Sequence, residues 1–310
     1  MKKAISEFKN ATSVKRLTSN HNKVYKVTTP NNVYIIKEMS EDTITPENID
    51  KKIEQLRVSE ELNKNGIKCI TPLKNIDNYF YYENNKYYLI FPYCENNDNE
   101  LITIEHIKQL AIIQSKIHKL NILSNLDCAY KIIEIDIDKI INDFMENKAI
   151  YNLLSNNKND LKELISMCNK SLKELKRNLC ISHNDYKMKN VLWKNLEATL
   201  IDFDAVALVN PTAALCESAF TFATLGIDIN YDYYKAYLKA YLENYGSLKE
   251  DFKSALYVSQ NGKLRWLQYL FNMKKDKEII PIVEDLILFN NNIEKFNNIY
   301  ENIKKENSVI

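Results

Sequence analysis

Glycine is scarce in this sequence: there are four in 310 residues, and none lies before position 66. This excludes a G-x-G-x-x-G loop in the N-terminal part, where bare backbone approaches a phosphate closely. The six cysteines are scattered, with no C-x-x-C pair and no histidine at the spacing of a zinc site. We therefore expect free thiols, no zinc and a reducing compartment such as the cytoplasm.

An excess of charge of one sign is also missing. Lys and Arg total 42 against 41 for Asp and Glu, so the chain lacks the basic field that nucleic-acid binding needs. No stretch approaches the ~18 consecutive apolar residues of a membrane span, and the N-terminal MKKAISEFKN turns polar after its two lysines. We expect no nucleic-acid partner, no membrane anchor and no export.

The first ninety residues show the pattern of strands with one inserted helix. Apolar β-branched and aromatic runs at 24–28 and 33–37 flank the turn Thr29-Pro30-Asn31-Asn32, which predicts a hairpin. Apolar residues at helical spacing predict a helix over 47–65 that ends at Gly66. Two further strands are predicted at 79–82 and 87–91.

From Thr103, a plausible N-cap, the apolar period becomes 3.6 and most of the remaining chain is predicted helical. Two short strands at 191–193 and 198–201 interrupt it. A length of 310 residues with 45% hydrophobic and 27% charged residues suits two packed lobes. We predict an α+β fold, with a small antiparallel-sheet lobe with one helix at 1–93 and a larger helical lobe at 94–310.

The segment that carries chemistry is His183-x-Asp185-x-x-x-x-Asn190, followed by Asp202-Phe-Asp204. Phosphoryl transfer needs a carboxylate that takes up the proton of the attacking hydroxyl and oxygen ligands for the metal ions that bridge the phosphates. Asp185 fits the first task, and Asn190 and Asp202 fit the second as magnesium ligands. His183 is interpreted as a support of the loop backbone.

Lys37 ends the second strand of the hairpin, on the same face as Val33 and Ile35. A lysine at the end of such a strand is typical of kinases, where it reaches the α- and β-phosphates of the nucleotide and a helix carboxylate holds it. Glu54 is the chosen carboxylate. Glu60 and Glu61 lie on the same predicted helix and remain alternatives.

These residues, together with Phe91–Tyr93 and Ile117-His118, resemble the aminoglycoside phosphotransferase and choline kinase superfamily, which has the protein-kinase-like fold. The Asp-Phe-Asp motif and the lack of an Ala-Pro-Glu segment favour this superfamily over protein kinases. The resemblance implies a phosphotransferase that moves the γ-phosphate of ATP or GTP, with Mg²⁺, to a small hydroxylated molecule. His118, on an apolar seam, is interpreted as a core histidine.

The resemblance also implies where the substrates bind. The nucleotide is expected between the lobes against the segment near Pro92–Glu95, which includes Tyr93 and Cys94, with Ser19 and Asn22 as donors in the glycine-free loop. A cationic acceptor is expected in the helical region after the motif, among acidic and aromatic residues that include Asp204, Glu217 and Trp266.

Three functions remain open at this point. An aminoglycoside-type kinase, with a possible role in antibiotic resistance, is the first; a choline, ethanolamine or sugar kinase is the second, which the His-Asn-Asp form of the loop favours. A non-catalytic kinase-like protein of the spore-coat type is the third. Intact Asp185, Asn190 and Asp202 argue for catalysis. The sequence distinguishes neither ATP from GTP nor one acceptor from another.

Overall fold

The computed structural model describes residues 8, 10–17, 22–40, 44–45, 47–76, 78–96, 101–226 and 228–308. The chain forms two compact units, of which the first comprises 1–101, 122–126 and 188–206 and the second the rest. The boundary expected between residues 93 and 94 had placed 188–206 in the second part. These residues join the first unit because Leu200 exchanges backbone hydrogen bonds of 2.9 Å with Lys68 and Ile70.

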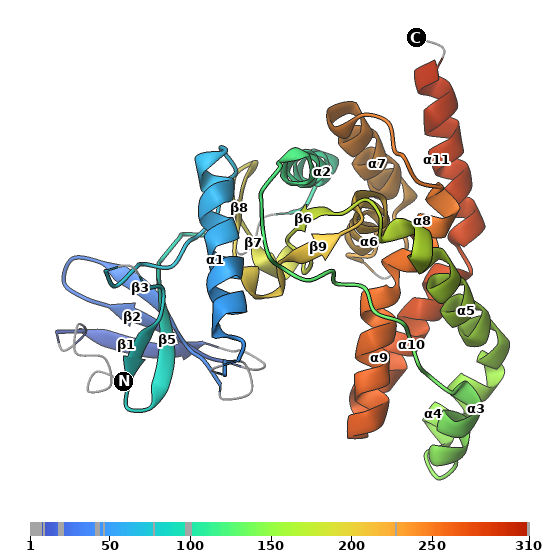
Figure 1. The fold of residues 1–310 in the computed structure, drawn as a ribbon, viewed down its shortest axis with the longest axis horizontal. Coiled ribbons are helices and arrows are strands. Elements are labelled where there is room, and N and C mark those ends of the chain that lie inside the picture. The colour runs from blue at the N-terminus through green and yellow to red at the C-terminus, as the bar shows by residue number, and fades with distance from the viewer. Residues whose placement is uncertain are drawn as a thin grey trace. The chain divides into compact units, whose positions relative to one another are not determined.

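An antiparallel sheet of five strands in the order β1-β2-β3-β5-β4 forms the base of the first unit (Figure 1). Its strands are β1 (Ser13–Leu17), β2 (Lys23–Thr28), β3 (Val33–Glu38), β4 (Tyr81–Glu83) and β5 (Lys86–Pro92). One helix, α1 (Ile49–Lys64), follows β3, and the chain leaves it through Gly66 at φ 78°. The hairpin, the helix and the two later strands match the sequence prediction, whereas β1 is additional.

Alternation along β5 divides the core of this unit into two clusters. Tyr88 and Ile90 join one cluster with Val27 and Ile36, while Leu89 joins another with Leu56 of α1. Successive side chains of a strand point to opposite faces, so the sheet buries apolar residues on both. Lys37 pairs in register with Leu89, which puts it on the face of α1.

The first unit also contains the hairpin of β7 (Val191–Lys194) and β8 (Glu197–Leu200). Its turn uses Asn195 at φ 57°, a left-handed conformation that asparagine tolerates. A short 3₁₀ helix precedes the hairpin at Met188–Asn190 and another follows it at Phe203–Ala205. Both strands agree with the sequence prediction.

The second unit is mainly helical. A two-stranded ladder of β6 (Cys180–Ser182) and β9 (Ala207–Val209) accompanies its helices, which are α2 (Ile104–Lys119), α3 (Ile137–Asp143), α4 (Lys148–Asn156), α5 (Lys158–Leu175), α6 (Pro211–Ala223), α7 (Tyr231–Tyr245), α8 (Phe252–Ser259), α9 (Asn261–Met273), α10 (Asp276–Asn290) and α11 (Ile293–Ser308). Thr103 caps α2 in a capping box with His106. The predicted fold class is confirmed.

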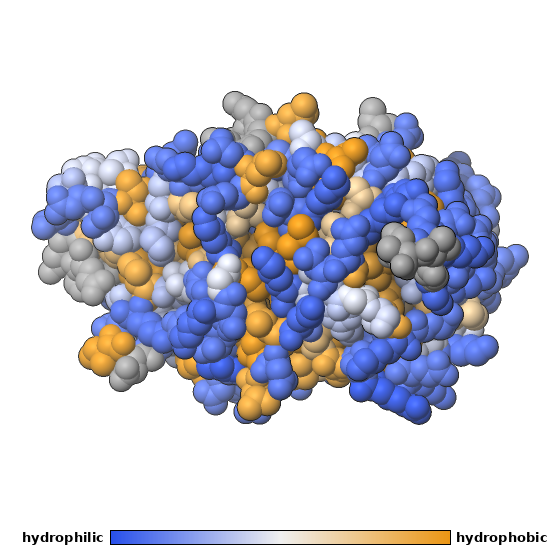
Figure 2. Space-filling model, turned by 90° about the horizontal axis from the view of Figure 1, so that it is seen from above, coloured by the Kyte–Doolittle hydropathy of each residue, from blue (hydrophilic) through white to orange (hydrophobic). Residues whose placement is uncertain are grey.

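Aromatic side chains fill much of the second unit. Phe220 of α6 packs edge-on against Phe289 and Phe296, with ring centroids 4.9 and 5.7 Å away. Hydrophilic residues cover most of the face in Figure 2, with smaller hydrophobic areas among them. In the part of the chain that the structure describes, no helix has the length and apolar character to cross a bilayer.

Candidate functional site

Lys37 at the end of β3 forms an ion pair with both carboxylates of the Asp-Phe-Asp motif. Its Nζ lies 2.9 Å from Asp202 Oδ1 and 2.5 Å from Asp204 Oδ2, and its side chain is only 12% exposed. Burial alone would lower the pKa of Lys37, but its attraction to Asp204 and Asp202 and its hydrogen bonds to them raise it. The ammonium therefore stays charged between two anionic partners.

The β7–β8 hairpin brings Asn190 and Asp202 to the same end of one ladder. Val191 pairs with Leu200, and Ile201 N donates to Asn190 O at 3.0 Å, so the ladder continues to the residue before Asp202. Two residues twelve positions apart thus become neighbours through strand register. The role of the two side chains as magnesium ligands stays a prediction.

Asp202 adopts the left-handed conformation, with φ 62° and ψ 69°. Such a conformation is uncommon outside glycine, although aspartate and asparagine adopt it more readily than most residues. Residues held in sparsely populated backbone regions cluster at functional sites. Here the bend turns the chain from β8 into the 3₁₀ helix that carries Asp204.

Helix α1 contacts this bend through two polar side chains. Lys52 Nζ donates to Asp204 O at 3.2 Å, and Gln55 Nε2 donates to Val206 O at 3.0 Å. Burial lowers the pKa of Lys52, an effect that the carboxylate of Asp204 opposes. Neither residue was among those predicted from the sequence.

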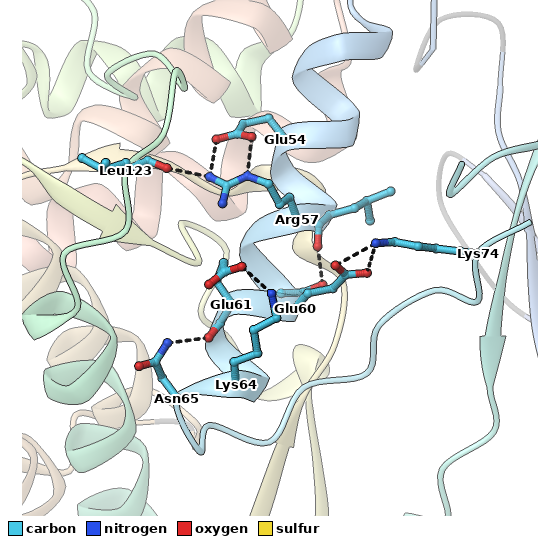
Figure 3. A network of polar contacts seen from close by, with 10 residues as sticks. Glu54, Arg57, Glu60, Glu61, Lys64, Asn65, Lys74 and Leu123 are labelled. Carbon is cyan, nitrogen blue, oxygen red and sulfur yellow. Dashed lines mark hydrogen bonds and ion pairs between the residues drawn. The ribbon is translucent and has the colours of Figure 1, made fainter. Parts of the chain in front are cut away.

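Glu54 does not hold Lys37, which corrects the predicted pairing. Figure 3 shows its carboxylate forked against Arg57, with both distances 2.7 Å, while Arg57 also donates to Leu123 O. The hydrogen bonds from Arg57 are the main cause that lowers the pKa of Glu54 to about 2. The alternatives Glu60 and Glu61 pair with Lys74 and Lys64 in the same network.

The remaining residues predicted at the nucleotide have local partners. Asn22 Oδ1 accepts from Ser40 N at 3.1 Å, the ring of Tyr93 lies 3.7 Å below the ammonium of Lys26, and Cys94 Sγ contacts Glu95 O at 3.5 Å. Ser19 lies outside the described residues.

In the second unit, Asp185 lies in the loop after β6 and pairs with Lys187, with 2.9 Å between Oδ1 and Nζ. Burial opposes the charge of Lys187, but the attraction of Asp185 and its hydrogen bond raise the pKa of the lysine. The preceding Asn184 is left-handed at φ 58°. The sequence motif identified the aspartate but not its lysine.

Acidic and basic side chains of the neighbouring helices interact with the charges of this loop. Glu217 of α6 is partly buried, and burial raises its pKa against the opposing charges of Lys187 and Lys263. Lys263 of α9 forms an ion pair with Asp285 of α10. Asp285 also lines a pocket of about 430 Å³ with Thr224, Gly226, Glu284 and Leu288.

Asp204 and Trp266, two of the residues predicted at the acceptor, each have a lysine nearby. The carboxylate of Asp204 belongs to the Lys37 ion pair in the first unit. Trp266 stacks on Tyr269 with centroids 5.0 Å apart, and the ammonium of Lys275 lies within 6.0 Å of both rings.

His118 connects three elements of the second unit. Its Nδ1 lies 2.7 Å from Tyr241 OH of α7, and its Nε2 lies 3.2 Å from Ser182 Oγ at the end of β6. Because Ser182 immediately precedes His183, this buried network supports the strand from which the Asp185 loop leaves. The interpretation of His118 as a core histidine agrees with these contacts.

Residues 13–250 match the model of a family described as phosphotransferase enzymes. Spectinomycin phosphotransferase, solved with ADP and spectinomycin, is 16% identical over 94% of each chain, with a TM-score of 0.65. A microcompartment-associated aminopropanol kinase is 14% identical over 93% of this chain and 92% of that one, with a TM-score of 0.64. Amicoumacin kinase, solved in complex with AMP-PNP, Ca²⁺ and Ami, is 12% identical over 91% of this chain and 88% of that one, with a TM-score of 0.60. No curated protein sequence matches the chain.

The buried His118 predicts a pH-dependent stability. Burial lowers its pKa to about 3, against roughly 6.5 in an unfolded chain, so the unfolded state binds the proton more readily. This contribution is complete above pH 6.5 and is lost as pH falls towards 3, at about 1.4 kcal/mol per pH unit. Urea unfolding at pH 8, 6.5 and 5 should show that the wild type loses about 1–2 kcal/mol more than His118→Gln between pH 6.5 and 5. Parallel pH profiles for the two proteins would contradict the assignment.

Proposed function

The chain belongs to the phosphotransferase enzyme family. We propose that it is a small-molecule kinase that moves the γ-phosphate of ATP or GTP to a hydroxyl of an amine-bearing molecule. The observation that carries this proposal is the contact of Lys37 with both Asp202 and Asp204. This contact joins the strand-end lysine, which would bind phosphates, to the carboxylates expected beside the metal.

The donor set suits magnesium. Asn190 and Asp202 would hold the ion through amide and carboxylate oxygens, the ligands that Mg²⁺ prefers. The carboxylates of Asp202 and Asp204 already converge on one cation, the ammonium of Lys37. When bound, the ion would neutralise negative charge that develops on the phosphates during transfer.

Asp185 is proposed as the base. As the acceptor oxygen bonds to the γ-phosphorus, the bond from that phosphorus to the bridging oxygen breaks, the nucleoside diphosphate leaves, and the hydroxyl proton passes to the Asp185 carboxylate. Lys187, 2.9 Å from Asp185 Oδ1, is placed to hold the carboxylate in position. Lys37 would bind the α- and β-phosphates.

The acceptor class follows from the charges around the pocket in the second unit. Glu284 and Asp285 supply carboxylates to its lining, and the ion pair of Asp285 with Lys263 connects it to the charges near Asp185. Partly exposed carboxylates attract a protonated amine, with little cost of desolvation. An amino alcohol or an aminoglycoside carries both the amine and the hydroxyl that this arrangement requires. Spectinomycin and aminopropanol kinases share the fold, which is consistent with this acceptor class.

Asp202→Asn should weaken nucleotide binding in the presence of magnesium. The substitution keeps the size of the side chain but removes a negative ligand, so calorimetry with ATP or GTP and Mg²⁺ should show a loss of at least 10-fold. Asp143→Asn, at an exposed position in α3, is the control and should bind like the wild type. Equal affinity of Asp202→Asn and the wild type would refute the metal assignment.

Asp185→Asn should separate binding from chemistry. A positioned base contributes about 10²–10⁴-fold, so kcat on the acceptor should fall by at least two orders of magnitude while nucleotide affinity changes little. Coupled detection of nucleoside diphosphate and calorimetry measure the two quantities. If the variant retains most of its turnover, Asp185 is not the base.

A screen of nucleotide consumption against aminoglycosides, amino alcohols, choline, sugars and nucleosides tests the acceptor class. Only amine-bearing acceptors should be phosphorylated, and Glu284→Gln should raise their KM about two- to fivefold, since exposed charge pairs are worth up to about 1 kcal/mol. Glu278→Gln, exposed on the same helix, is the matched control and should leave KM unchanged. Turnover of neutral sugars alone, or equal effects of the two variants, would overturn this proposal.

A further inference from the structure

Lys52 is a charged residue of the first unit that takes no part in the reaction proposed above. It lies in the first turns of α1, partly buried, and its ammonium donates to a main-chain oxygen, Asp204 O, at 3.2 Å. Among the described residues, no carboxylate lies within ion-pair distance of it. A lysine carries three N–H donors, so this contact leaves donor capacity for another acceptor.

The charges around Lys52 are unevenly shared. Lys37 forms ion pairs with the carboxylates of Asp202 and Asp204. Lys52 interacts with both aspartates only through longer-range electrostatic attraction, and the charge of Lys37 repels it. A partly buried cation without a paired anion is costly, and an anionic ligand that arrives beside it removes this cost. The position next to Lys37 and Asp202 is where the proposed function requires a polyphosphate.

The lack of glycine in the N-terminal part of the chain is a further reason to expect a cation at this position. No glycine lies before Gly66, so main-chain N–H groups of a glycine-rich loop are not available to surround the phosphates. A nucleoside triphosphate brings about four negative charges, of which one magnesium ion offsets about two. Lys37 is shared with the carboxylates of Asp202 and Asp204, so it leaves negative charge on the phosphates that a second ammonium in the same unit would offset.

We propose that Lys52 is a second phosphate-binding lysine of the nucleotide site, which acts with Lys37 in place of a glycine-rich loop. This inference rests on the proposed nucleotide-dependent phosphotransfer and names a binding residue for it. The bond to Asp204 O would place the ammonium beside the bend that carries Asp202, from where it reaches phosphate oxygens.

The test is calorimetry with Mg²⁺ and the triphosphate, the diphosphate and the free nucleoside of whichever of ATP and GTP binds more tightly. Lys52→Met removes the charge and the hydrogen bond, Lys52→Gln keeps a donor for Asp204 O without the charge, and Lys52→Arg keeps both. Lys51→Met, exposed on the same helix, is the matched control. Charge-assisted hydrogen bonds support a loss of about 10-fold or more for the triphosphate in Met and Gln variants.

The losses should shrink from triphosphate to diphosphate and fall below about twofold for the nucleoside, with near-complete recovery in Lys52→Arg. Two results would overturn this inference without affecting the proposed function. The first is that Lys52→Met binds the triphosphate as tightly as Lys51→Met. The second is that Lys52→Gln binds it like the wild type, which would mean that Lys52 only supports Asp204 O. If the wild type binds neither triphosphate, the proposed function itself fails, and the inference with it.

Discussion

The first unit depends on one ion pair between segments that are far apart in the sequence. Lys37 meets Asp202 and Asp204 across 165 and 167 positions of chain. A partly buried ion pair gains little net stability, because desolvation offsets most of the attraction, yet removing one partner leaves a charge uncompensated. The surrounding structure is consistent with retention for function: the sheet orients the lysine, the β7–β8 hairpin delivers the aspartates, and α1 binds the bend between them.

Strand register explains how such a site can be built from short motifs. The hairpin needs only Asn195 at its turn and a few alternating apolar residues to set its pairing, and the pairing then fixes which residues meet at its open end. A slip by one position would move Asn190 away from Ile201 and send every side chain of the strand to the opposite face. The magnesium assignment therefore depends on the hairpin as much as on the motif itself.

Much of this was predictable from the sequence. The hairpins, α1, α2 and the motif residues follow from local apolar periods and spacing, whereas β1 was missed because an edge strand with mostly exposed residues carries little apolar signal. The sequence prediction chose Glu54 by its position along α1, but the pairing depends on which side of the helix the residue lies on. At 3.6 residues per turn it lies roughly 160° around the helix from Lys52, so it faces Arg57 and Leu123 and not the bend. Pairs made by tertiary contact, such as Lys263 with Asp285, have no local signature.

Each carboxylate proposed to act in the reaction has a lysine at hydrogen-bond distance: Asp185 has Lys187, and Asp202 and Asp204 share Lys37. These ammonium groups offset the negative charge of the carboxylates before substrates arrive. The ammonium groups must also move away from the carboxylates when a metal ion or an acceptor binds there. A lysine that leaves a carboxylate loses little if a phosphate is there to receive it, because one anion replaces another. Binding of the metal and of the polyphosphate should therefore favour each other, since each supplies the charge that the other displaces.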